Sequence, residues 1–327
     1  MSAVVQHDLI IVGAGAAGLS AAITACALRL RVLVLEAAPR PGGQLLANPQ
    51  PIVDCPGLDV ASGPAAATEL LRHLERLGGE VRTGVRVDRI DVATATVIVD
   101  GAPLTASDLL LATGATPRRL GVPGEADVPG RGRSPAARRH GARFAGRPAL
   151  VVGGGDVALE EAALLARECP QVTLVHRGPR LRARPDFCAA VAADPRITVL
   201  LDTRLTAILG DPDVEAAELA TPDGPRTIPC GAVVVCAGMA PNSGLVADQL
   251  DLDAGGFVQI DARQRSSAPR LYAAGDVCAG AWWTVSAAIG QASVAVKDLE
   301  RRIARGEFSA VLVPGPTFAP TSGGDEA

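Results

Sequence analysis

The sequence predicts an α/β fold with two Rossmann-like dinucleotide-binding domains, of which the first is discontinuous and the second is inserted into it. Two glycine-rich turns, at residues 13–18 and 153–158, indicate this fold, because each lies between an apolar strand and an apolar helical stretch. The length of 327 residues agrees with it, since a chain of that size has room for two compact domains.

The first turn reads Gly13-Ala14-Gly15-Ala16-Ala17-Gly18. We expect strands at residues 8–12 and 31–35 on either side of a helix at 19–28. The glycines permit a tight turn, close approach of the backbone to a pyrophosphate, and close packing of the helix on the strand. Glu36 ends the second strand, where a carboxylate accepts hydrogen bonds from an adenosine ribose. These residues predict a dinucleotide site whose phosphates lie at the helix N-terminus.

The second turn reads Gly153-Gly154-Gly155-Asp156-Val157-Ala158, with an alanine at the third glycine position. It follows an expected strand at residues 149–152 and opens a helix expected to continue to residue 167. The strand at 172–175 completes a second unit of the same kind. We therefore expect a second dinucleotide site here.

The residues after that strand bear on which nucleotide is bound. His176 and Arg177 stand where a ribose-binding acid would favour NAD, and Arg180 and Arg182 follow closely. An arginine there can pair with a 2′-phosphate, so the site favours NADPH over NADH. The alternative is that these arginines are solvated surface residues.

A third marker is the apolar strand in residues 271–276, which ends in Gly275 and Asp276. A carboxylate at such a strand end can accept hydrogen bonds from the hydroxyls of a polyol chain. The helix expected from about Thr284 to residue 302 would direct the positive end of its dipole toward a ligand bound at this strand end. Two other apolar strands lead into the segments 112–117 and 236–242. We expect these segments to be the paired crossings between two intercalated domains.

Composition excludes several classes of protein. A hydrophobic content of 48%, a charged content of 20% and a mean hydropathy of +0.25 exclude a disordered chain, and no apolar run reaches membrane-spanning length. A net charge of −4 without a basic stripe makes nucleic acid and membrane partners unexpected. The seven cysteines form no Cys-x-x-Cys pair, which fits reduced thiols, and the four histidines lack metal-ligand spacing. With no leader segment recognised, we expect a cytoplasmic protein without a metal site.

Together the motifs resemble the low-molecular-weight thioredoxin reductases over nearly the whole chain. The residues that carry the resemblance are 13–18, Glu36, Gly42-Gly43-Gln44-Leu45, Pro56-Gly57, 112–114, 153–158, His176-Arg177 and Gly275-Asp276. The resemblance implies FAD and NADPH as cofactors and a homodimer. It implies an FAD domain at residues 1–117 and 245–314, a NAD(P)H domain at 118–244, and a flexible tail at 315–327.

The resemblance also implies individual contacts. Gln44 would contact the flavin and Asp276 its ribityl chain, while Gly155, Arg177 and Arg182 would contact the nucleotide. The other cofactor contacts expected, beyond the two glycine turns and Glu36, are Gly43, Asp54, Val87, Ala112, Thr113, Gly114, His176, Gly238, Gly275 and Thr284.

One departure from the family falls at its redox dithiol. Thioredoxin reductases carry Cys-x-x-Cys-Asp-Gly after a Gly-Arg-Gly turn, here residues 130–132. An ungapped comparison places Ala136, Arg139, His140 and Gly141 there instead. Alanine and arginine form neither a thiolate nor a disulfide, so a dithiol relay at that segment is chemically impossible. His140 could be a proton donor near the flavin, or an exposed loop histidine.

A second departure falls shortly before the last helix, where the family usually has Arg-Gln and this chain has Trp283-Thr284, preceded by Trp282. Trp283 could stack on the flavin and shape an acceptor pocket, or it could fill the core or a dimer contact. Cys55 could be a lone redox thiol, although a small buried hydrophobe is the simpler interpretation. Trp283, Cys55 and His140 are thus the candidate catalytic residues.

These observations predict an FAD-dependent NADPH oxidoreductase that passes hydride to flavin and on to an acceptor other than thioredoxin. A ferredoxin-type carrier, a small molecule and dioxygen remain open as acceptors. The alternative from another class is a non-catalytic FAD-binding sensor or partner subunit, against which the two complete nucleotide motifs argue.

Overall fold

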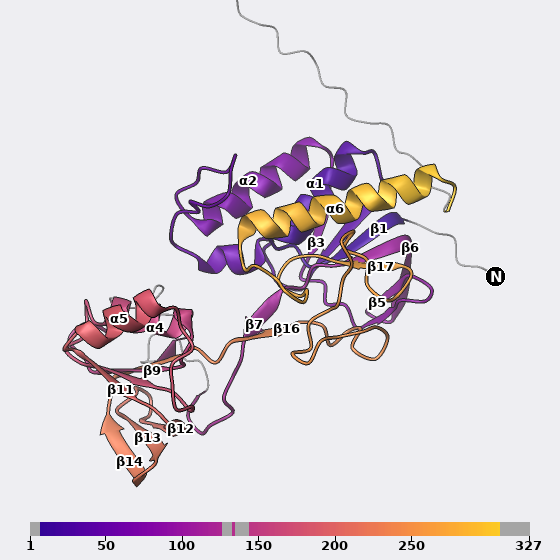
Figure 1. Cartoon of the computed structure of the whole chain (residues 1–327). Coiled ribbons are helices and arrows are strands. Elements are labelled where there is room, and N and C mark those ends of the chain that lie inside the picture. The colour runs from indigo at the N-terminus through magenta and orange to yellow at the C-terminus, as the bar shows by residue number, and fades with distance from the viewer. Residues whose placement is uncertain (1–6, 126–132, 135–143, 308–327) are drawn as a thin grey trace, which may run out of the picture. The chain divides into compact units, whose positions relative to one another are not determined.

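The structure, a computed structural model, describes residues 7–125, 133–134 and 144–307. By their contacts they divide into two compact units, which Figure 1 shows. The first unit combines the chain up to Thr116 with the chain from Ala240 onward, and the second runs from Pro117 to Met239. None of the helices in this part of the chain is long and apolar enough to cross a membrane.

The first unit is built on a seven-stranded sheet with the order β3-β2-β1-β6-β5-β4, in which β17 also pairs with β6. Strands β1, β2, β3, β6 and β17 pair in parallel, whereas β4, β5 and β6 form an antiparallel meander. The strands are β1 (His7–Val12), β2 (Val32–Glu36), β3 (Val81–Thr83), β4 (Arg89–Asp91), β5 (Thr96–Val99), β6 (Ala102–Leu111) and β17 (Leu271–Ala273). The parallel strands all direct their carboxyl ends to one edge of the sheet, as a doubly wound fold requires.

Helices α1 (Ala16–Ala27), α2 (Gly63–Arg76) and α6 (Val285–Ala304) cover one face of this sheet (Figure 1). Alanines let α1 and α6 pack closely, and they share one buried cluster with sheet residues. The alanines that α1 and α6 contribute to the buried part of that cluster are Ala17, Ala21, Ala22, Ala25, Ala288, Ala292 and Ala295. A second cluster fills the other face, where residues from 245–278 pack on the sheet.

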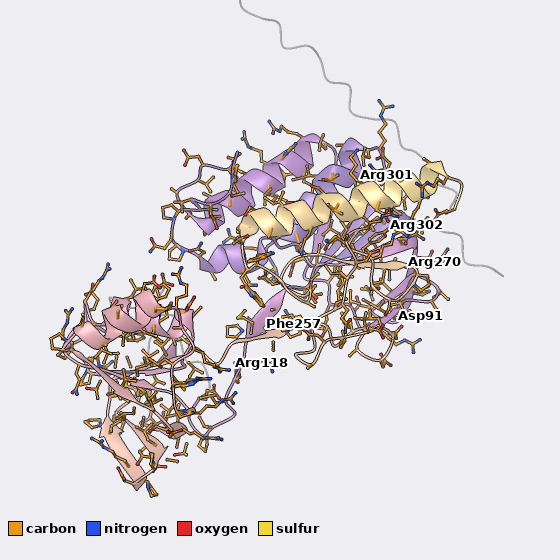
Figure 2. The ribbon with its side chains drawn as sticks, in the orientation of Figure 1. Asp91, Arg118, Phe257, Arg270, Arg301 and Arg302 are labelled. Carbon is orange, nitrogen blue, oxygen red and sulfur yellow. The ribbon has the colours of Figure 1, made fainter. Side chains whose placement is uncertain are left out.

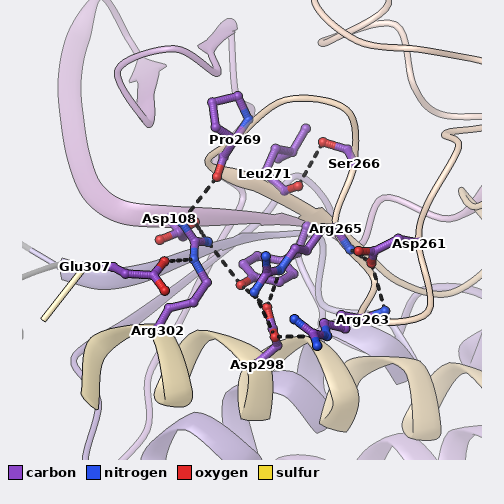
Figure 3. Close-up of polar contacts among 11 residues, drawn as sticks. Asp108, Asp261, Arg263, Arg265, Ser266, Pro269, Leu271, Asp298, Arg302 and Glu307 are labelled. Carbon is purple, nitrogen blue, oxygen red and sulfur yellow. Dashed lines mark hydrogen bonds and ion pairs between the residues drawn. The ribbon is translucent and has the colours of Figure 1, made fainter. Parts of the chain in front are cut away.

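A buried charge network fixes the last turns of α6 to the sheet (Figure 3). Arg302 Nη1 donates to Asp108 Oδ1 on β6 at 2.8 Å, and Arg302 Nε donates to Glu307 Oε2 at 2.9 Å. One turn earlier, Asp298 accepts from Tyr272 Oη at 2.8 Å and from Arg265 Nη2 at 2.9 Å. Arg302 is buried, whereas its neighbour Arg301 is exposed (Figure 2).

The second unit is a smaller α/β body around a parallel sheet of order β11-β10-β9-β15-β8. Its strands are β8 (Arg133–Ser134), β9 (Ala149–Val152), β10 (Val172–Val175), β11 (Ile197–Leu200) and β15 (Ala232–Val235). Helices α4 (Asp156–Leu165) and α5 (Pro185–Ala193) pack on it, and an antiparallel sheet of order β12-β13-β14 completes the unit. The strands of that sheet are β12 (Arg204–Leu209), β13 (Ala216–Thr221) and β14 (Gly224–Pro229).

The two crossings between the units pair with each other, which confirms that part of the prediction. Strands β7 (Ala115–Pro117) and β16 (Met239–Pro241) form a two-stranded sheet where the chain passes from one unit to the other. Other elements begin or end at residues different from those expected. Helix α1 begins at Ala16 rather than at residue 19, because Gly15 is its extended N-cap residue and alanine favours a helix. The strand expected over 271–276 ends at residue 273, because Gly275 turns the chain at φ +80°.

Candidate functional site

The first glycine turn contains three glycines that serve different purposes. A Cβ on Gly13 would collide with the carbonyl of Ala112, and one on Gly18 would collide with the carbonyl of Gly13. Packing therefore requires glycine at both positions. Gly15 is different, because a Cβ there would meet nothing within 4 Å. It is the N-cap residue of α1, has no side chain to cap the helix, and has no acidic residue in the turn after it, so the N-terminus of α1 can receive an anionic group.

Glu36 is held beside this turn by two backbone amides. The N–H of Ala14 donates to Glu36 Oε2 at 2.7 Å, and the N–H of Ala38 donates to Oε1 at 2.8 Å. The carboxylate is half-buried at the carboxyl end of β2. Each oxygen retains a second lone pair for the hydroxyls of a ribose.

Gln44 and Asp276 meet at the same edge of the sheet. Gln44 Nε2 donates to Asp276 Oδ2 at 2.7 Å, and the nearest atom to a Cβ on Gly114 would be that same Nε2, at 3.7 Å. Gly275 lies against the start of α1, since a Cβ on Gly275 would stand 3.0 Å from the Cβ of Ala17. Burial raises the pKa of the Asp276 carboxyl above its ordinary value, and the hydrogen bond from Gln44 opposes that rise. Three distant parts of the chain thus line one cradle.

Asn242 fixes the Thr113–Gly114 part of this cradle through three hydrogen bonds. The sequence alone does not identify this role. Its N–H donates to the Gly114 carbonyl at 2.9 Å, its Nδ2 donates to the Thr113 carbonyl at 2.8 Å, and Thr113 Oγ1 donates to the Asn242 carbonyl at 2.8 Å. The only sequence signal is its place at the end of the segment 236–242, which the sequence identifies as a crossing.

The remaining predicted residues of the first site have mixed surroundings. A Cβ on Gly43 would lie 3.1 Å from the Cα of Gly15, so Gly43 does border the first turn. Thr284 is the N-cap of α6 and accepts from the N–H of Ala287 at 3.2 Å. Asp54 is exposed, whereas Val87 and Ala112 are buried apolar side chains. Val87 belongs to the core cluster on the opposite face from α1, so its side chain serves packing.

The three candidate catalytic residues differ in burial and in what the structure describes of them. Cys55 is buried in a cluster with Leu45, Ile52 and residues of α2, and burial, with Asp54 beside it, raises the pKa of its thiol. This agrees with a small buried hydrophobe. Trp283 is 49% exposed and therefore does not fill the core. His140 lies outside the described residues, as do Ala136 and Arg139.

The second glycine turn repeats the division of roles seen in the first. A Cβ on Gly153 would crowd Ala158, and one on Gly154 would collide with the ring of His176. Gly155 again meets nothing within 4 Å and is the N-cap of α4, without a side-chain cap. Ala158 is buried, whereas Asp156 and Val157 are exposed. The carboxylate of Asp156 accepts from the N–H of Arg184 at 2.8 Å.

The residues after β10 surround this turn. His176 is buried against Gly154, and burial together with Arg182 and Arg177 lowers the pKa of its ring. His176 therefore supports the turn as a neutral side chain. The N–H of Arg182 donates to the Gly154 carbonyl at 2.6 Å. Arg177, Arg180 and Arg182 are exposed, and none has an ion-pair partner within the part of the chain that the structure describes.

Gly238 is exposed at φ +88° beside the second crossing, where its carbonyl accepts from the N–H of Arg118 at 2.8 Å. Arg118 is labelled in Figure 2. All seven cysteines lie in the described residues, and all are free thiols. Within those residues, no group of histidine, cysteine and acidic side chains could hold a metal ion.

Both turns fit a bound dinucleotide, because the middle glycine of each leaves open space at an uncapped helix N-terminus. Comparison with known proteins agrees. The chain is 35% identical to a thioredoxin reductase of Treponema pallidum over 299 residues, which cover 89% of this chain and 95% of the relative. It is 35% identical to a thioredoxin reductase of Mycolicibacterium smegmatis over 307 residues, covering 91% of this chain and 97% of the relative.

A crystal structure of the Lactococcus lactis thioredoxin reductase is similar with a TM-score of 0.79 and 28% identity, over 92% of this chain and 100% of that one. FAD and NADPH are the cofactors of these relatives. The family model described as "Pyridine nucleotide-disulphide oxidoreductase" matches residues 7–297. The chain therefore belongs to the pyridine nucleotide-disulphide oxidoreductase family and has the thioredoxin reductase-like fold, with FAD and NAD(P)H Rossmann-type domains.

Proposed function

We propose that this FAD-dependent oxidoreductase uses NADPH to reduce an acceptor other than thioredoxin, without a dithiol relay. The relatives are named for thioredoxin, so the acceptor proposed here differs from the one in their name. The observation that carries the proposal is in the sequence, which contains no Cys-x-x-Cys and has Ala136 and Arg139 where the family dithiol is expected. A relay needs a thiolate and a second sulfur close to it.

The thiols that the chain does have are poor substitutes. Burial raises the pKa of Cys230, Cys236 and Cys278 to about 12, so each is a neutral thiol at physiological pH. Cys55 and Cys278 are the two thiols of the first unit nearest to the proposed flavin residues in sequence. They belong to different buried clusters, one under α2 and the other on the far face of the sheet.

The first unit would hold FAD through residues already described. The N-terminus of α1 at Gly15 would receive the pyrophosphate, Glu36 would bind the adenosine ribose, and Asp276 with Gln44 would bind the ribityl chain. When bound, FAD supplies the redox chemistry, which is hydride acceptance from NADPH and delivery of electrons to the acceptor. The residues supply binding, orientation and exclusion of water.

The second unit would hold NADPH in the same manner. Gly155 opens the N-terminus of α4 to the pyrophosphate, and Arg177 and Arg182 are exposed cations that a 2′-phosphate would neutralise. Strand β10 ends without a carboxylate, which removes the group that favours NADH.

Anaerobic reduction tests this function. NADPH added to the FAD-loaded protein under argon should bleach the flavin absorbance, and the colour should return on challenge with the true acceptor. Oxygen, a ferredoxin, a quinone and thioredoxin are then added separately. Bleaching that thioredoxin alone reverses would overturn the proposal. A flavin that NADPH leaves yellow would favour a non-catalytic flavoprotein.

A further inference from the structure

The two tryptophans of the chain are adjacent and exposed. Trp282 is 80% exposed and Trp283 is 49% exposed, immediately before the N-cap residue of α6. The chain has only eight aromatic residues, five Phe, two Trp and one Tyr, and no other two of them are adjacent in the sequence. Large aromatic side chains normally bury most of their surface, so an exposed pair indicates a binding surface.

The backbone holds Trp283 in a conformation that tryptophan seldom adopts. Its φ is +57°, in the left-handed region that favours glycine and asparagine. Its ring meets Phe257 edge-on, with 5.7 Å between the ring centroids and 81° between the planes. Strained residues of this kind concentrate at functional sites, where the surrounding structure fixes them.

Phe257 in turn is tied to the cofactor cradle. The N–H of Val258 donates to the Val277 carbonyl at 3.0 Å, and the N–H of Ala279 donates to the Val258 carbonyl at 2.9 Å. Phe257 (labelled in Figure 2) therefore lies alongside the segment that begins at Asp276. Ser243 Oγ donates to the Gly256 carbonyl at 2.7 Å, which joins the same loop to Asn242 and thereby to Gly114. The indole of Trp283 thus contacts a loop that is hydrogen-bonded to the segment after Asp276 and to Ser243.

The charge of the sequence segments that contain the cradle residues, Phe257 and the tryptophans favours an uncharged ligand. The segments that build the cradle and support the tryptophans, residues 41–60, 241–260 and 274–290, contain no lysine, arginine or histidine. Their charged residues are Asp54, Asp59, Asp248, Asp251, Asp253 and Asp276. The negative charge of these segments would repel an acidic protein carrier, whereas it would not repel a neutral aromatic ring.

We propose that Trp283 stacks on a planar, uncharged aromatic acceptor of the quinone class, with Trp282 at the rim of the same surface. This inference rests on the proposed function and names its substrate class. The overall reaction balances: NADPH loses a hydride and becomes NADP⁺, while the quinone gains the electron pair and two protons, one from the hydride and one from solvent, and becomes the hydroquinone. Trp283 binds and orients the ring and takes no electrons itself.

Tryptophan fluorescence tests the binding directly, without turnover. Trp282→Phe leaves Trp283 as the single reporter, and Trp283→Phe leaves Trp282. In the FAD-loaded protein without NADPH, 1,4-naphthoquinone should shorten the fluorescence lifetime of Trp283 saturably. The anionic 1,4-naphthoquinone-2-sulfonate should bind at least tenfold more weakly, because the segments around Phe257 and the tryptophans in sequence carry negative charge and no positive charge. A lifetime that neither quinone changes would overturn the inference.

Substitution separates binding from packing. Trp283→Asn and Trp283→Gly suit the left-handed backbone, so the thermal midpoint should be unchanged or higher. The KM for naphthoquinone should rise at least tenfold in both, whereas Val294→Gln, which changes an exposed apolar side chain on α6, should leave it unchanged. An unchanged KM together with a lowered thermal midpoint would assign Trp283 to packing. That result would refute the quinone-binding role of Trp283 and leave the proposed function standing. If thioredoxin proves to be the only acceptor of the unmodified protein, the proposed function fails as well.

Discussion

Gln44 and Asp276 are separated by 232 positions in the sequence, yet Gln44 Nε2 donates to Asp276 Oδ2 at 2.7 Å. This bond joins the two chain segments that make the first unit, one before and one after the second unit. It also places a half-buried carboxylate beside the start of α1. The pair is therefore the natural place to test whether the first unit holds FAD.

We predict that Asp276→Ala lowers the FAD content of the purified protein several-fold, because it removes both the hydrogen bond to Gln44 and the acceptor for the ribityl hydroxyls. The ratio of flavin absorbance to protein absorbance measures it. Asp248→Ala, at an exposed aspartate of the same unit, is the control and should keep its flavin. Equal flavin content in the two variants would exclude Asp276 from the cofactor site.

The middle glycines give a paired prediction. Because a Cβ at Gly15 or Gly155 meets no protein atom within 4 Å, alanine at either position should change the free energy of unfolding of the cofactor-free protein by only about 1 kcal/mol. Gly15→Ala should lose FAD, and Gly155→Ala should keep FAD but bind NADPH more weakly. Gly18→Ala should instead destabilise the fold, since its Cβ collides with the Gly13 carbonyl. Urea unfolding measures the stability of each variant, and flavin absorbance measures its FAD content. An equal loss of FAD in Gly15→Ala and Gly155→Ala would contradict the assignment of two separate sites.

Arg177→Ala should weaken NADPH binding by roughly 1–3 kcal/mol and leave NADH binding nearly unchanged, because one charge-assisted bond to the 2′-phosphate is lost. The KM values for the two nucleotides report the difference. Arg226→Ala, at an exposed arginine on β14, is the matched control. If the unmodified protein used NADPH and NADH equally, the proposed role of Arg177 would be wrong.

A pH dependence follows from Asp108. Burial raises the pKa of its carboxyl from 3.8 to about 6, although Arg302 opposes the rise. The folded chain thus holds this proton more tightly than the unfolded chain, so the stability contributed by the group is complete below about pH 4 and is lost as the pH rises through about 6. Asp108→Asn keeps an oxygen for Arg302 and cannot ionise. Its free energy of unfolding relative to the unmodified protein should rise by roughly 1 kcal/mol between pH 5 and pH 7.5 in urea titrations, and parallel curves would refute the assignment.

Much of the fold could be predicted because local sequence determines it. The two glycine turns, the strand at residues 172–175 and the paired crossings follow from apolar runs broken by glycine. Helix bounds are less predictable, since alanine continues a helix into the turn at Ala16 without any cap signal.

Features of the site that depend on distant contacts could not be predicted. The bonds of Asn242 to Thr113 and Gly114 join residues more than a hundred positions apart, and no local pattern marks them. The left-handed backbone of Trp283 and its contact with Phe257 likewise come from tertiary packing. The sequence indicates that Trp283 lies near the site, but its exposure had to come from the structure.

The most direct test of the central claim is thioredoxin-dependent oxidation of NADPH by the unmodified protein, compared with Cys55→Ser/Cys278→Ser. If electrons leave without a dithiol, thioredoxin turnover stays at the no-enzyme background in both proteins, while turnover with a quinone persists in both. Thioredoxin turnover in the unmodified protein that disappears in the double serine variant would contradict the account, and would make Cys55 and Cys278 a catalytic pair.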